Sequence, residues 1–88
     1  SSSRMALLEG DVLVKLGRLG EAEEALERAV RLEPRLSAAY DELLYIHVQT
    51  RNKEKALSVL RRHYAILDPG SDKARKILAD IATLRKLQ

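Results

Sequence analysis

The sequence has no cysteine, tryptophan or phenylalanine, and its 88 residues include only two prolines and three tyrosines. The absence of cysteine excludes disulfide bonds, thiol nucleophiles and thiolate metal ligands. No hydrophobic run approaches the roughly 18–20 residues that a membrane span needs. Because aromatic residues are so scarce, the core has to be built from Leu, Val, Ile and Ala.

Hydrophobic residues make up 45% of the chain and charged residues 33%, which is typical of a globular domain rather than a disordered one. Leu, Ala, Glu, Lys and Arg are abundant, and these residues are the strongest helix formers. The composition therefore predicts one small all-α domain.

The charge is unevenly distributed. Residues 1–50 hold six basic and nine acidic side chains, a net charge of −3, whereas residues 51–88 hold ten basic and four acidic ones, a net charge of +6. One interpretation is that this contrast steers a partner or a second subunit. The other is that the solvated helix faces of the two halves simply differ in charge.

Small residues recur at regular steps between residues 10 and 34. Steps of seven and five residues alternate from Gly10 through Gly17, Ala22 and Ala29 to Pro34. Seven residues are two helical turns, and five cross a tight corner. The pattern therefore predicts a close seam between two antiparallel helices, where larger side chains would not fit.

Apolar spacing predicts five helices, over residues 4–16, 20–33, 38–50, 53–67 and 72–87. Gly17 and Pro34 are expected to end the first two helices, and Ser37 and Ser71 to cap the third and fifth. Glu24–Arg28 and Glu27–Arg31 have the i,i+4 spacing of ion pairs within the second helix. The expected buried stripes of the third and fifth helices include Tyr40, Leu43, Leu44, His47 and Val48, and Ala74, Ile77, Leu78, Ile81 and Leu84.

Shifting the chain by 34 residues aligns these helices with one another. Ala22 then falls on Ala56 and Leu26 on Leu60, whereas Pro34 falls one residue short of Pro69. The helix over 72–87 matches the first helix of each pair and has no second helix after it. We therefore expect a repeat over about 4–36, a second over about 37–70 and a capping helix over about 71–87, in one domain over 4–88. The chain opens with SSSRM rather than an initiator Met, so residues 1–3 are expected to be disordered or an addition left by cloning of an excised domain.

A helix–turn–helix period of this length resembles the tetratricopeptide repeat family. The first copy carries Gly10, Gly17, Ala22-x3-Leu26, Ala29 and Pro34, and the second carries Tyr40-x2-Leu43, Ala56-x3-Leu60 and Pro69. Departures from the family pattern are Glu9, Leu44, Arg51 and His63, where the family favours Leu, a small residue, Gly and Ala. The resemblance implies a right-handed α-solenoid that binds proteins and does not catalyse a reaction.

The resemblance also implies a concave groove, formed by the first helix of each repeat, for an extended or helical peptide. By register, its residues are Leu7, Leu8, Asp11, Val14 and Lys15, then Asp41, Glu42, Tyr45, Val48 and Gln49, then Arg75 and Lys76. Family members that grip the C-terminal carboxylate of a chaperone tail use Lys and Asn, where this chain has Leu7, Asp11 and Glu42. Only Lys76 fits that pattern, so a basic or amphipathic peptide is expected instead.

Other functions have weaker support in the sequence. A structural segment that spaces other domains or stacks into homo-oligomers is the main alternative. Nucleic acid is disfavoured, because the basic residues of the C-terminal half lack interleaved aromatics. His47 and His63 fall on seam positions, so we interpret them as core residues rather than zinc ligands. No catalytic constellation or cofactor is indicated, and the cytoplasm is only a default location.

Overall fold

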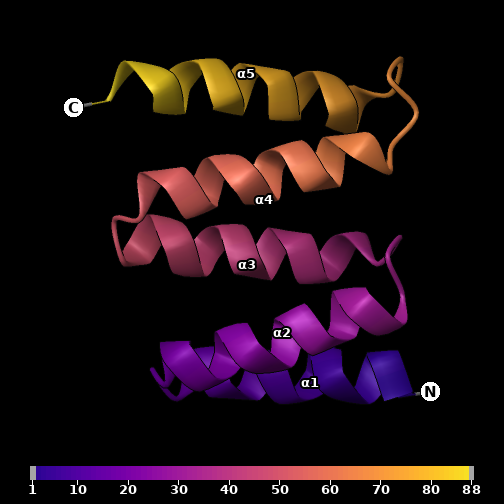
Figure 1. Cartoon of the computed structure of the whole chain (residues 1–88), viewed down its shortest axis with the longest axis vertical. Coiled ribbons are helices and arrows are strands. Elements are labelled where there is room, and N and C mark those ends of the chain that lie inside the picture. The colour runs from indigo at the N-terminus through magenta and orange to yellow at the C-terminus, as the bar shows by residue number, and fades with distance from the viewer. Residues whose placement is uncertain (1, 88) are drawn as a thin grey trace.

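A computed structural model describes residues 2–87, which form five α-helices and no strand (Figure 1). The helices are α1 (Ser2–Lys15), α2 (Leu19–Leu32), α3 (Ser37–Gln49), α4 (Lys53–Ala65) and α5 (Asp72–Lys86). The all-α class and the five helices predicted from the sequence are therefore confirmed. None of these helices is both long and apolar enough to cross a membrane.

Successive helices run in alternating directions and are stacked from α1 at the bottom of Figure 1 to α5 at the top, with overall dimensions of 32 × 29 × 16 Å. α1 packs against α2 as the first hairpin, and α3 packs against α4 as the second. α3 also contacts both α2 and α1, whereas α5 packs against α4. The second hairpin thus stacks directly on the first, and α5 covers the far side of α4.

The close seam predicted between the first two helices is confirmed. A Cβ atom added to Gly10 would lie 2.6 Å from Cγ and Cδ2 of Leu26, which is closer than real Cβ contacts come. Ala22 and Ala29 are fully buried beside them. Because α1 has no side chain at Gly10, Leu26 packs directly on the backbone of α1.

Backbone conformation at the helix ends agrees with the sequence in most places. Gly17 has φ +77, the left-handed geometry expected after α1. Arg51 has φ +57 at the equivalent corner of the second hairpin. Ser71 caps α5, since its Oγ accepts a hydrogen bond of 3.1 Å from the amide of Ala74.

Two helix starts differ from the prediction. α1 begins at Ser2, before the expected start at residue 4, and the buried Ser3 hydroxyl donates a hydrogen bond of 2.7 Å to Glu33 at the end of α2. Residue 1 lies outside the described residues. Ser37 is not the cap of α3 but lies inside the helix, because its hydroxyl is engaged by the His63 ring instead.

The core face of α3 is wider than the predicted stripe. Ala39 and Ile46 are buried, whereas Val48, expected inside, is 48% exposed. Leu78 of α5 is likewise 48% exposed rather than buried. α3 packs against the first hairpin on one side and α4 on the other. Its buried surface therefore covers more of the helix than one stripe.

The two ion pairs predicted within α2 give way to pairs between helices. Arg28 contacts Glu9 of α1 at 2.8 Å, and Glu27 contacts Arg62 of α4 at 2.7 Å. α2 therefore uses these charges to hold its neighbours rather than to stabilise its own helix.

Overpacking the seam should destabilise the domain. We expect Ala22→Leu to lower the free energy of unfolding by about 1–3 kcal/mol, because Ala22 is completely buried. Gly20→Ala is the matched control, since a Cβ atom there meets no atom within 4 Å. The control should leave stability unchanged or raise it by up to about 1 kcal/mol. Urea unfolding measures both, and an unchanged midpoint for Ala22→Leu would show that the α1–α2 contact is not close there.

Candidate functional site

A pocket of about 360 Å³ lies between α1 and α3. Its lining residues are Arg4, Leu7, Leu8, Asp11, Ala38, Asp41 and Glu42. The structure thus brings together five of the residues expected in the groove, three from α1 and two from α3. Leu7 also packs against the buried core, so the floor of the pocket is fixed.

Two acidic residues face each other across this pocket. Asp11 of α1 and Glu42 of α3 both line it, and their carboxyl groups are close enough to influence each other's pKa. Partial burial and this contact with Asp11 raise the pKa of Glu42 to about 7. Asp11 also accepts a hydrogen bond of 2.9 Å from Lys15, which lowers the pKa of Asp11. The pair therefore takes up one proton as the pH falls through about 7.

The third acid of the pocket is already engaged. Asp41 Oδ1 lies 3.0 Å from the ammonium of Lys73 of α5, and it is half-exposed. Lys73 offsets the charge of Asp41 and Lys15 offsets that of Asp11, so the uncompensated acidity of the pocket belongs mainly to Glu42.

The remaining expected groove residues lie elsewhere. Val14 is half-buried and packs against the core, and Tyr45 is exposed. Val48 and Gln49 line a second pocket of about 440 Å³, which also includes Leu84 and Leu87 near the end of α5.

Arg75 and Lys76 lie apart from both pockets. Arg75 pairs with Asp72 and donates 2.7 Å to the carbonyl of Gly70, and Lys76 pairs with Asp80 at 3.1 Å. The backbone of α5 packs against α4 rather than α3. Arg75 and Lys76 therefore do not extend the pocket between α1 and α3.

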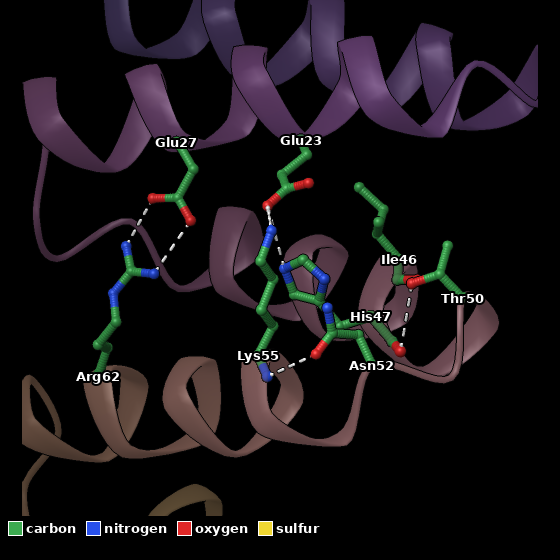
Figure 2. A network of polar contacts seen from close by, with 8 residues as sticks. All are labelled: Glu23, Glu27, Ile46, His47, Thr50, Asn52, Lys55 and Arg62. Carbon is green, nitrogen blue, oxygen red and sulfur yellow. Dashed lines mark hydrogen bonds and ion pairs between the residues drawn. The ribbon is translucent and has the colours of Figure 1, made fainter.

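A polar layer joins α2 to the second hairpin (Figure 2). Glu27 receives two hydrogen bonds, of 3.0 and 2.7 Å, from the guanidinium of Arg62. Glu23 accepts a hydrogen bond of 3.3 Å from Lys55 and lies 3.6 Å from Nε2 of the buried His47. Asn52 caps α4 by accepting from the amide of Lys55 at 3.1 Å. These contacts tie α2 to α4 and, through His47, to α3.

Ser37, His63 and Asp41 are grouped in an arrangement that the sequence analysis did not find. His63 Nε2 lies 2.9 Å from Ser37 Oγ, and Nδ1 lies 3.8 Å from Asp41 Oδ1. The second distance is too long for a hydrogen bond. The His63 ring is 2% exposed and stacks on Tyr40 at 5.1 Å. We therefore interpret the group as a buried link between α3 and α4. The sequence does contain a signal for this contact, because an antiparallel hairpin that turns near residue 51 places residues 37 and 63 opposite each other.

The comparisons with known proteins agree with this architecture. Residues 3–36 match the model of the tetratricopeptide repeat family, so the first hairpin is a tetratricopeptide repeat. The five helices of residues 2–87 form an all-α helical repeat that resembles this family in architecture. Repeats of this family generally mediate interactions between proteins and are typically not catalytic. No curated protein matches the chain.

The two buried histidines make stability depend on pH. Burial lowers the pKa of both His47 and His63. The unfolded chain takes up these protons below about pH 6.5, while the folded chain resists them. Their contribution to stability is therefore complete above that pH and is lost as the pH falls below it.

We expect His63→Gln to lose less stability than the unchanged protein on acidification. Urea unfolding at about pH 7.5 and 5.0 measures both losses. Glu42 contributes to the pH dependence of both proteins, so its effect cancels in the difference. Equal losses would show that His63 is as easily protonated in the folded protein as in the unfolded chain.

Proposed function

We propose that this chain is a non-catalytic protein-interaction module whose pocket between α1 and α3 binds a basic side chain of a partner polypeptide. The observation that carries the proposal is the facing pair of Asp11 and Glu42 beside apolar side chains. A repeat of this family supplies the general role in protein interaction.

The charge state of the pair favours a cation. Two carboxyl groups in contact take up a proton more readily than one alone, because their negative charges repel. An incoming ammonium or guanidinium group relieves that repulsion and can replace the proton. A carboxylate of a partner would be disfavoured, because Asp11 and Glu42 would both repel it.

The apolar part of the pocket suits the stem of such a side chain. Leu7 and Leu8 line the pocket from α1, and Ala38 lines it from α3. Lys and Arg bury their methylene stems along apolar surfaces while the charged end stays among polar groups. A volume of about 360 Å³ accommodates one such side chain with its immediate neighbours.

A short peptide tests the charge requirement. The probe is a capped pentapeptide with a central arginine between leucines, and its control has citrulline in place of arginine. We expect the arginine peptide to shift the amide resonances of Leu7, Asp11 and Glu42. The Glu42→Lys variant should bind it about tenfold more weakly or worse. The variant Glu54→Lys makes the same charge change on an exposed position of α4.

Equal binding of the arginine and citrulline peptides would overturn the charge-based recognition. Equal weakening by Glu54→Lys and Glu42→Lys would show that net charge, not this pocket, attracts the peptide. Helical circular dichroism of each variant confirms that it folds.

The same pair predicts how binding depends on pH. Glu42 has a pKa of about 7, so acidification from about pH 8 to 6 protonates it and removes a negative charge from the pocket. The affinity for the arginine peptide should therefore fall over this range. Titration calorimetry at each pH measures the change. The Glu42→Gln variant should bind weakly with a flat profile, and an equally steep profile in this variant would assign the pH dependence to another group.

A further inference from the structure

A pocket larger than the two described above lies on the side of α1 and α2 that does not face α3. It measures about 810 Å³ and is lined by both helices. We call this surface the outer face and define it by Met5, Glu9, Val12, Glu21, Arg28 and Leu32. Met5 is 72% exposed and Val12 47% exposed, so the face presents large apolar side chains to solvent.

The second repeat shows what covers the equivalent surface. A shift of 34 residues places Met5 on Ala39 and Val12 on Ile46. Ala39 is 0% exposed and Ile46 2% exposed, within the core that includes residues of α2. The surface that stays open on the first hairpin is therefore closed by a helix on the second.

Charged contacts fix how that covering helix lies. Glu23 and Glu27 are four residues apart on α2, and they contact Lys55 and Arg62 of α4, respectively (Figure 2). Under the same shift, Arg62 corresponds to Arg28, so the positive charge is kept on the outer face. Lys55 corresponds to Glu21, so the charge there is reversed.

We propose that the outer face binds an amphipathic α-helix of a partner protein, which lies on α1 and α2 as α2 lies on α3 and α4. Its apolar stripe packs on Met5 and Val12. Its polar edge carries a basic residue toward Glu21 and, four residues later, an acidic residue toward Arg28. Arg28 already donates a hydrogen bond to the carboxylate of Glu9, and its guanidinium has further donors for a second carboxylate.

A second copy of the chain fits this description poorly. Within the five helices, a basic residue is followed four residues later by an acidic one only at Lys76 and Asp80 of α5. These two side chains pair with each other at 3.1 Å. Asp80 also lines a depression shared with Leu44 and Leu60 of its own domain. To offer this pattern to the outer face, a second copy would therefore have to break the pair between Lys76 and Asp80.

The test uses the full chain and a capped peptide with the sequence of α2, residues 19–32, carrying Glu23→Lys. This peptide has the required apolar stripe, a base at the first position and an acid at Glu27. A control peptide carries Glu23→Lys together with Glu27→Lys. We expect the first peptide to shift amide resonances of residues 5–12 and 21–32, and the control to bind about tenfold more weakly.

Variants of the protein separate specific docking from general attraction. Met5→Glu and Val12→Glu combined should abolish binding without loss of stability, because both side chains are exposed. Arg28→Glu should reverse the preference, so that the control peptide binds better than the first. The reversal can be measured even when neither peptide is fully helical in solution.

The outcomes decide the proposal. Peptide binding at the outer face with the Arg28→Glu reversal supports it. Absence of shifts at the outer face at millimolar peptide overturns it, as does equal binding of the two peptides. Light scattering across a concentration series is the final control. Self-association that Met5→Glu and Val12→Glu remove would assign the face to a second copy and overturn the partner helix.

Discussion

The contact between Gly10 and Leu26 is the constraint on which the other helix positions depend. Leu26 lies against the backbone of α1, so α1 and α2 approach more closely than two helices with ordinary side chains between them. This approach sets the width of the surface on which α3 rests. α3 in turn positions Glu42 opposite Asp11. A larger residue at the seam would therefore change the candidate groove without touching it.

Much of this arrangement could be predicted from the sequence, because it depends on local rules. Gly17 and Ser71 act at helix ends, where one residue decides the backbone conformation or the cap. The hairpin seam follows from the spacing of small residues. The family match covers this same first hairpin, where the pattern is most regular.

Features that depend on how hairpins stack were harder to predict. Ile46 and Val48 are both strongly hydrophobic residues of α3, yet Ile46 is buried and Val48 is half-exposed. The difference arises because α2 and α4 approach α3 from two sides, and a single helical stripe contains no such information. Pairing of Asp11 with Glu42 was likewise not predicted, although both were expected in the groove. Their register across α1 and α3 depends on how α3 packs on both α1 and α2, not on either helix alone.

The last helix, α5, has few packing partners, yet one of its side chains contacts the groove. The backbone of α5 packs against α4 alone, and Lys73 reaches across to Asp41 of α3. Helices with few packing partners open at lower free energy than the rest of a domain and exchange their amide hydrogens sooner. Opening of α5 would withdraw the ammonium of Lys73 and leave Asp41 uncompensated. The electrostatic potential of the groove would then become more negative, so local unfolding of the last helix would strengthen the attraction of a cationic ligand.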